Sequence, residues 1–200
     1  MELVDRFRGY LPVVVDLETG GFDAQTNPLL ELACVMLDWQ DNQLVTVDQH
    51  AWCVAPFAGS SADPASLKVT GIDLDDPNRR GLEEHEAVRE FFGRVRTMMK
   101  AKQCTRAILV AHNAAFDHNF LNAAVSRCEI KRSPFHPFST IDTASLAAVA
   151  YGHTVLSEAC RRAGIDFNNK HAHRAAYDAT CTAQLFCKIV NESPFEVPAD

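Results

Sequence analysis

Two acidic residues follow a run of valines near the start of the chain. Asp16 and Glu18 come directly after residues 13–15 and precede Gly20 and Gly21. A valine run is typical of a buried strand, and side chains two positions apart on a strand share a face. Two carboxylates on one face repel each other unless a cation lies between them. Taken alone, the stretch fits solvated acids before a turn as well as it fits part of a cation site.

Three later residues have matching chemistry. Asp117 lies in the first turn of an expected helix that follows an expected buried strand over 106–111, and His173 and Asp178 lie five residues apart where the last long helix is expected. Alone, Asp117 fits a helix acid stabilised by the helix dipole, and the other two fit an exposed histidine and a solvated acid. The combination favours a shared site.

The combined set of residues suits a two-metal phosphodiesterase. Four carboxylates balance the charge of two divalent cations, and ligation by oxygen alone suits Mg²⁺ or Mn²⁺ rather than zinc. Two such ions about 3.5–4 Å apart can hold the attacking and leaving oxygens of a phosphodiester displacement. A neutral His173 is then suited to take the proton from the attacking water.

Three segments resemble the motifs of the DEDDh exonuclease family, a branch of the ribonuclease H-like exonucleases. They are VDLETGG at 15–21, HNAAFD at 112–117 and HRAAYD at 173–178, and they occur in the order of the family. A tyrosine four residues before the last acid would mark the other branch. The resemblance implies His173 as general base and metal ligands at Asp16, Glu18, Asp117 and Asp178.

The resemblance extends to the ribonuclease T group of that family and covers nearly the whole chain. DRFRG at 5–9, KRSPFHPFSTIDTA at 131–144 and LFCKIVN at 185–191 carry it. It implies that Phe22, Phe116 and Phe138 stack on bases of a 3′ end, with core packing as the alternative for each. The chain departs from the group in the loop helix, where Val69 and Ala65 replace the usual aromatic residue and glutamate.

Basic residues occur in small clusters along the chain. The segment 94–106 holds five basic residues and no acid. This pattern fits either favourable electrostatics at a helix end or contacts with phosphates of RNA. The resemblance implies a homodimer in which the basic patch of one subunit feeds the active site of the other. The candidate contacts with the RNA backbone are Arg6, Arg8, Lys100, Lys102, Arg106, Lys131 and Arg132.

Several other polar residues have two interpretations. Asp142 fits a helix cap as well as a residue that supports the site. We expect His112 and Asn113 to shape the turn before the helix acid. His171, seven residues before the last acid, is the second choice for the base. His136 fits a role in packing its turn slightly better than contact with substrate.

Length and pattern predict a single α/β domain with a ribonuclease H-like, mixed five-stranded sheet flanked by helices. We expect the domain to span 1–193 and a loose tail to span 194–200. The loop 55–81 is long enough to be functional, and the segment 133–138 is expected to be a stiff aromatic loop. Strands are expected near 13–18, 29–37, 43–54, 106–111 and 140–141, and helices near 64–70, 83–100, 115–127, 143–151, 155–163 and 174–191.

Composition limits the class of protein. A hydrophobic share of 47% and a charged share of 22% indicate a globular chain. The net charge of −7 argues against a protein that coats nucleic acid. Seven scattered cysteines without CxxC pairs favour reduced thiols in the cytoplasm. No apolar run reaches the length of a membrane span, and the N-terminus lacks the apolar segment of a signal peptide.

The motifs and the resemblance together imply a Mg²⁺-dependent 3′–5′ exoribonuclease of the ribonuclease T type, using two Mg²⁺ ions that Mn²⁺ can replace. It would trim the 3′ ends of tRNA and other stable RNAs, extend its activity to single-stranded DNA, and release nucleoside 5′-monophosphates. The alternatives are a DNA proofreading exonuclease, an oligoribonuclease-like enzyme and, from another class, a non-catalytic RNA-binding module.

Overall fold

Five strands form one mixed sheet in the computed structural model, which describes residues 2–193. The strand order is β3-β2-β1-β4-β5; β1 pairs antiparallel with β2 and parallel with β4, β2 pairs antiparallel with β3, and β4 pairs parallel with β5. The expected tail at 194–200 lies outside the described residues. The strands are β1 (Tyr10–Thr19), β2 (Leu29–Gln40), β3 (Gln43–Cys53), β4 (Arg106–Ala111) and β5 (Phe135–Asp142).

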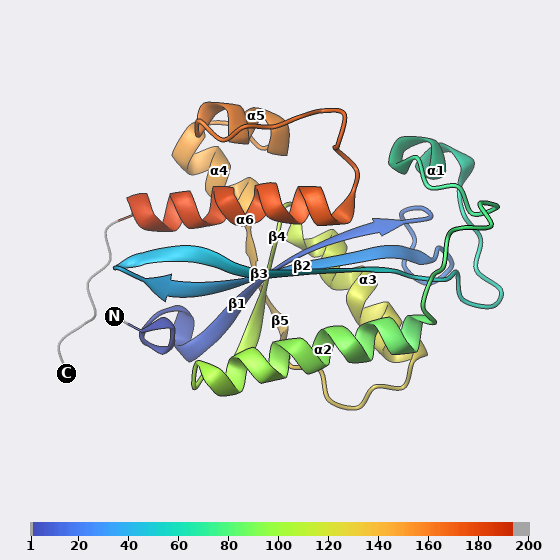
Figure 1. Cartoon of the computed structure of the whole chain (residues 1–200), viewed down its shortest axis with the longest axis horizontal. Coiled ribbons are helices and arrows are strands. Elements are labelled where there is room, and N and C mark those ends of the chain that lie inside the picture. The colour runs from blue at the N-terminus through green and yellow to red at the C-terminus, as the bar shows by residue number, and fades with distance from the viewer. Residues whose placement is uncertain (1, 194–200) are drawn as a thin grey trace.

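Helices cover both faces of the sheet (Figure 1). The helix α6 crosses one face with α4 and α5 packed outside it, while α2 and α3 lie on the other face; α1 lies beyond the end of β1. The expected single α/β domain with a mixed five-stranded sheet is therefore confirmed. The helices are α1 (Pro64–Thr70), α2 (Glu84–Ala101), α3 (Ala114–Arg127), α4 (Thr143–Tyr151), α5 (Leu156–Arg162) and α6 (Ala175–Glu192), preceded by the short 3-10 turns η1 (Leu3–Asp5) and η2 (Phe7–Gly9).

The core follows from the sequence pattern. The valine run 13–15 lies in the central strand and is fully buried, because helices cover both faces there. In α2, Val88, Phe91, Phe92 and Val95 recur at helical spacing and form the buried side of the helix. Burial of apolar side chains at both faces thereby fixes β1 in the centre of the molecule.

One expected element is wrong. The segment 133–138 is not a loop throughout, because β5 begins at Phe135 and the pairing with β4 starts between Phe135 and Ala107. The register shifts before the pair Leu109 and Thr140. Pro137 has no N–H to donate, and an edge strand with an irregular register is where a sheet tolerates proline.

The strand ends define the position of a possible site. The carboxyl end of β1 points toward α1, and the first residues of α3 and α6 lie beside it in contact with β1 (Figure 1). Within residues 2–193, no helix combines the length and the apolar character needed to cross a membrane.

Candidate active site

The two acids of the first motif lie near the carboxyl end of β1. Strand alternation places Asp16 and Glu18 on one face of the sheet, with Leu17 buried between them on the other. Glu18 is buried and Asp16 is only partly exposed. The pairing with β2 shifts its register between Glu18 and Thr19, so the strand deviates from regular pairing directly after the acids.

Asp117 joins these acids through a backbone contact. Its Oδ1 atom accepts a hydrogen bond of 3.1 Å from the amide of Leu17, which lies between the two acids of β1. The helix α3 places Asp117 there because the chain turns sharply at Asn113, whose φ of 68° is left-handed. Asn113 stands at the N-cap position, but its side chain makes no capping bond.

The side chain of Asp142 makes the capping bonds that Asn113 does not make. Its Oδ1 atom accepts from the amides of Asn113 at 2.9 Å and Ala114 at 3.4 Å, and also from Ala144 at the start of α4. One carboxylate thus satisfies amides at the starts of two helices. This position fits a helix cap. It also fits a residue that supports the site, because the turn that Asp142 caps leads directly to Asp117.

The last motif lies where α6 begins. His173 precedes the helix, has a left-handed φ of 61°, and donates its amide to Asp178 Oδ2 at 2.8 Å. The other oxygen of Asp178 is buried and has no hydrogen-bond partner. Ligand atoms of Glu18, His173 and Asp178 all lie within 4.8 Å of one another.

The acids are electrostatically strained as a group. Burial raises the pKa of Asp16 well above its usual range, and the charges of Asp117 and Glu18 raise it further. Burial followed by the charge of Asp178 raises the pKa of Glu18 to about 8. For Asp117, burial raises the pKa to about 8 against the opposing effect of the hydrogen bond from Leu17. Burial also raises the pKa of Asp178.

This arrangement fits divalent cations. The donor set is carboxylate oxygen with one imidazole, and the unpartnered Asp178 Oδ1 needs a positive partner inside the protein. Cations would offset the cost of burying these charges and the repulsion among Asp16, Glu18 and their neighbours. The candidate ligands are Asp16, Glu18, Asp117 and Asp178.

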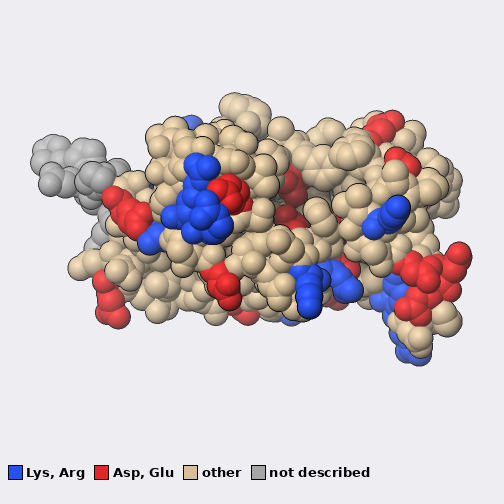
Figure 2. All heavy atoms as spheres, turned by 90° about the horizontal axis from the view of Figure 1, so that it is seen from above, with Lys and Arg blue, Asp and Glu red and all other residues tan. Residues whose placement is uncertain are grey.

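An apolar cavity of about 520 Å³ adjoins the acids. Glu18, His112 and His173 contribute to its polar side, while Phe22 and Phe116 contribute to its apolar side. The two phenylalanine rings meet edge to face at 6.2 Å, and Phe22 is 82% exposed. Space-filling atoms show acidic atoms recessed in a hollow near the middle of the face that α6 helps to form (Figure 2).

The wall opposite the rings comes from α1. Ala65, Ser66 and Val69 line this side of the cavity. Phe138 does not line it; that side chain is 79% exposed on β5, and its ring lies nearly perpendicular to the His136 ring with 4.5 Å between the ring centroids. The structure therefore places two of the three expected stacking residues beside the acids and the third outside the cavity.

The remaining histidines have local partners. His112 contacts the hydroxyl of Thr143 at 2.9 Å and the carbonyl of Thr154 at 2.7 Å, and burial lowers its pKa. His136 is buried and accepts from the amide of Ser139 at 2.9 Å, which favours its packing role. His171 packs against the ring of Tyr177 and does not belong to the cluster of ligand atoms.

The expected basic residues do not surround the acids. Arg106 pairs with Tyr10 at the amino ends of β4 and β1, whereas Glu18 lies eight residues further along β1. A strand rises about 3.3 Å per residue, so the two positions are about 26 Å apart. On the face of the molecule that Figure 2 displays, the Lys and Arg side chains form separate groups.

Some of these basic residues already have partners. Lys102 forms an ion pair of 2.6 Å with Asp38, and the guanidinium of Arg8 lies over the ring of Tyr10. The guanidinium of Arg6 lies over the rings of Phe7, at 5.5 Å, and Trp39, at 5.7 Å. The side chains of Lys100, Arg106, Lys131 and Arg132 are exposed.

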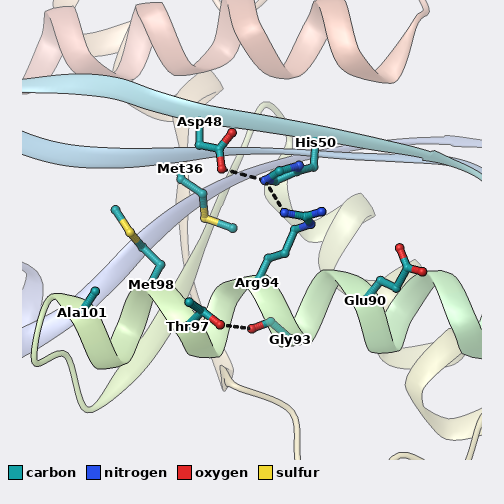
Figure 3. Close-up of a pocket in the computed structure, with 9 residues that line it drawn as sticks. All are labelled: Met36, Asp48, His50, Glu90, Gly93, Arg94, Thr97, Met98 and Ala101. Carbon is teal, nitrogen blue, oxygen red and sulfur yellow. Dashed lines mark hydrogen bonds and ion pairs between the residues drawn. The ribbon is translucent and has the colours of Figure 1, made fainter.

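A second hollow of about 530 Å³ lies on the other face of the sheet, between α2 and strands β2 and β3 (Figure 3). Its acids are paired: Asp48 contacts His50 at 2.8 Å, and Glu90 accepts from the indole of Trp52 at 2.8 Å. His50 also contacts Arg94 at 3.2 Å. This hollow holds none of the expected site residues and lacks unpaired acids suited to a cation.

Sequence reasoning missed Glu31. This residue lies directly across from Glu18 in the antiparallel register of β1 and β2, and its Oε2 atom accepts a hydrogen bond of 3.2 Å from the amide of Ala175. Only the register between the two strands could have indicated that Glu31 lies beside the site.

Comparison with known proteins identifies a family profile and curated relatives. A family profile described as an exonuclease matches residues 13–186. Proteins named ribonuclease T from Hahella chejuensis and Marinobacter nauticus are each 54% identical to the chain, over 94% and 93% of its length and 87% and 85% of theirs.

Solved structures support the fold at low sequence identity. Escherichia coli exonuclease I in complex with a dT13 oligonucleotide has a TM-score of 0.67 at 17% identity, over 92% of this chain and 41% of that one. A 3′-exonuclease described in 3′-end recognition of a histone mRNA stem-loop has a TM-score of 0.69 at 16% identity, over 90% of this chain and 63% of that one. With a profile that spans most of its residues and relatives above 50% identity, the chain belongs to the exonuclease family that includes these ribonuclease T proteins.

Proposed function

We propose that the protein is a Mg²⁺-dependent 3′–5′ exoribonuclease of the ribonuclease T type, which trims the 3′ ends of tRNA and other stable RNAs and also accepts single-stranded DNA. One observation carries the proposal: Glu18, His173 and Asp178 converge within 4.8 Å at the polar side of a cavity whose other side is aromatic. This proximity supports a hydrolytic centre with a stacking platform for bases beside it.

The four carboxylates are proposed to hold two Mg²⁺ ions, which Mn²⁺ can replace. Bound there, the ions would supply an activated water and stabilise the charge that develops on the phosphate. The unpartnered oxygen of Asp178 and the raised pKa values of Glu18 and Asp117 support this assignment.

His173 is proposed to act as the general base. Its side chain is exposed, and a ring nitrogen lies near the oxygens of Glu18 and Asp178. A neutral imidazole in this place can take the proton of the attacking water. Water attack that expels the 3′ oxygen of the preceding nucleotide leaves the phosphate on the departing nucleotide, so the product is a nucleoside 5′-monophosphate.

Phe22 and Phe116 are proposed to stack on bases at the 3′ end. Each stacked base contributes about 1–3 kcal/mol, and stacking tolerates every base. Phe138, which is exposed outside the cavity, is proposed to contact a nucleotide further from the end.

A homodimer would explain the position of the basic residues. Arg106, which pairs with Tyr10, lies about 26 Å from Glu18 of the same chain along the strands, and Arg8 precedes that end of β1. We propose that this patch, with Arg6, Lys100, Lys102, Lys131 and Arg132, guides RNA toward the acids of a second subunit. We place the activity in the cytoplasm, which suits the seven unpaired cysteines.

The rival functions differ in substrate or in chemistry. A DNA proofreading exonuclease or an oligoribonuclease-like enzyme would use the same acids, and the relatives named ribonuclease T favour the proposed type instead. A non-catalytic RNA-binding module would need no intact acid cluster, whereas all four acids and the histidine are present in this chain.

A degradation assay tests the proposal. The substrate is 5′-labelled duplex RNA with a 3′ overhang, compared with DNA of the same sequence, with Mg²⁺ or with EDTA. Asp16→Asn and His173→Ala should lower the rate by about 10²–10⁴-fold. The matched controls Asp48→Asn and His50→Ala, which alter the second hollow, should keep the rate. Wild-type activity of either site variant, or activity in EDTA, would refute the mechanism.

A further inference from the structure

Glu31 is a fifth carboxylate beside the candidate site. It lies on β2 directly opposite Glu18 in the antiparallel register. Among residues 2–193, the group of potential ligand atoms within 4.8 Å of one another consists of Glu18, His173 and Asp178, and it does not include Glu31. Its position therefore calls for a role other than membership of that group.

The start of α6 provides that role. The first amides of a helix have no partner within the helix, and the N-cap residue Arg174 contributes no capping bond from its side chain. Glu31 Oε2 accepts the amide of Ala175 at 3.2 Å. Glu31 thus caps α6 from a neighbouring strand, and a negative charge there also complements the helix dipole.

The capped amide is two residues from His173. The backbone of His173 has a left-handed φ of 61°, a conformation that residues other than glycine adopt only at a cost in energy. Contacts of the surrounding chain must therefore hold it. Its own amide is bound by Asp178 Oδ2 at 2.8 Å. The segment 173–175 is therefore held at one end by Asp178 on α6 and at the other by Glu31 on β2.

We propose that Glu31 is a positioning residue: it caps α6 and thereby holds His173 in place over Glu18 and Asp178. The inference rests on the proposed function, in which His173 is the base. Loss of the cap would displace the imidazole, and small displacements of a reacting group cost up to about 100-fold in rate. Binding of RNA in the aromatic cavity would change little, because Glu31 does not line it.

Two substitutions separate a cap from a metal ligand. Glu31→Gln keeps an oxygen that can accept the Ala175 amide but removes the charge that a cation would need. Glu31→Ala removes both. Gln49→Ala is the matched control, because Gln49 on β3 also reaches the first turn of α6, where its side chain donates to the carbonyl of Ala176 at 2.7 Å.

The test combines turnover with amide hydrogen exchange on the full-length chain. With a short single-stranded RNA and Mg²⁺, Glu31→Ala should lower kcat by about 10–100-fold with KM unchanged, while Glu31→Gln stays within about threefold of wild type. Exchange at amides 175–177 should accelerate in Glu31→Ala and stay slow in Glu31→Gln. Gln49→Ala should match wild type in both measurements.

Other results overturn the proposal. Unchanged kcat or unchanged exchange in Glu31→Ala would show that no cap holds His173. A Glu31→Gln variant as slow as Glu31→Ala, with weakened Mn²⁺ binding in calorimetry, would make Glu31 a ligand. Hydrogen exchange does not depend on activity, so it reports on the cap alone. A wild-type rate in His173→Ala would instead refute the proposed base, and the two failures are therefore distinguishable.

Discussion

At the scale of residues, the site is an arrangement of acids that is unfavourable without a positive partner. Glu18, Asp117 and Asp178 are buried together, and Asp16 lies beside them. The types and spacing of these acids were sufficient to predict a cation site. The unpartnered oxygen of Asp178 could not be predicted, because it depends on which backbone amides reach each carboxylate.

The raised pKa values predict how stability depends on pH. In the metal-free folded protein Glu18 and Asp117 keep protons up to about pH 8, whereas in the unfolded chain they lose them near their ordinary values. The folded state binds more protons in this interval, so the free energy of unfolding should fall as pH rises from about 4.5 to 8. Thermal unfolding in EDTA measures this, and Mg²⁺ should raise Tm more at pH 8 than at pH 5.5. A Tm in EDTA that rises with pH would contradict the burial of these acids.

Asp16→Asn should separate stability from metal binding. It removes a buried carboxyl group whose ionisation the fold disfavours, so the variant in EDTA at pH 8 should unfold at a higher temperature than wild type, by about 2–4 °C for each kcal/mol gained. The additional stabilisation by Mg²⁺ should be smaller. Asp48→Asn is the control, because Asp48 pairs with His50 and lies in the second hollow. It should leave the Mg²⁺ effect unchanged. A variant whose Mg²⁺ response equals that of wild type would remove Asp16 from the ligands.

Phe22→Ala tests the stacking platform. Loss of about 1–3 kcal/mol of stacking corresponds to an increase in KM of about 5–150-fold for a short RNA. The ring is 82% exposed, so Tm should change little. Val149→Ala is the control, because Val149 on α4 is 90% exposed and lies away from the cavity. A KM equal to that of wild type would assign Phe22 no part in binding.

At the scale of elements, the periodic segments were predictable and the contacts between segments were not. The buried strand of valines, α1 and α2 follow local patterns of apolar and capping residues. The start of β5 was missed because a segment bracketed by two prolines has the local signature of a turn, and only its pairing with Ala107 makes it a strand. Glu31 was missed for the same reason, since its partner Ala175 lies 144 residues away.

The loop that carries Phe22 is tied to the segment before α1. Asn27 donates to the carbonyl of Ser61 at 2.7 Å and accepts from the amide of Asp23 at 2.9 Å, and the amide of Asp63 donates to Gly20 at 2.6 Å. These bonds join the two walls of the cavity, one with the rings and one with Val69.

Asn27→Ala should remove the side-chain hydrogen bond that connects these two segments, together with the bond from the amide of Asp23. We expect KM for RNA to rise about threefold to tenfold with kcat nearly unchanged, and Tm to fall by a few degrees, since a hydrogen bond contributes about 1 kcal/mol. Asn78→Ala is the control, because the side chain of Asn78 bonds only within its own turn to Asp76. The prediction fails if Asn27→Ala binds RNA as wild type does.

At the scale of the whole molecule, Lys100 and Arg106 lie far from the acids of the same chain. Lys100 and Arg106 lie around the amino end of β4, while the acids lie toward the carboxyl end of β1. We therefore predict that long RNA bound at this patch is delivered to the acids of a second subunit.

Lys100→Ala combined with Arg106→Ala should weaken binding of long RNA and leave dinucleotide cleavage intact. The slope of log affinity against log salt concentration should decrease by about 1.4, since each phosphate contact on a single strand contributes about 0.7. Arg161→Ala with Lys188→Ala, which removes two basic residues that pair with acids on α5 and α6, is the charge-matched control. Unchanged affinity at several salt concentrations would exclude the patch.

Mixed subunits test whether the patch acts across a dimer. Subunits with Asp16→Asn keep the patch, and subunits with Lys100→Ala and Arg106→Ala keep the acids. If the patch serves the partner, mixing the two should restore activity on long RNA. Activity no higher than the sum of the separate preparations would place the patch and the acids in the same chain.

The central claim is that the acids and His173 direct water at the terminal phosphodiester of a 3′ end. The most direct measurement is the chemical identity of the nucleotides released from RNA in Mg²⁺, resolved by chromatography over the time course. We predict nucleoside 5′-monophosphates, released one at a time from the 3′ end. Release of 2′,3′-cyclic or 3′-monophosphates, or of internal fragments, would contradict the mechanism.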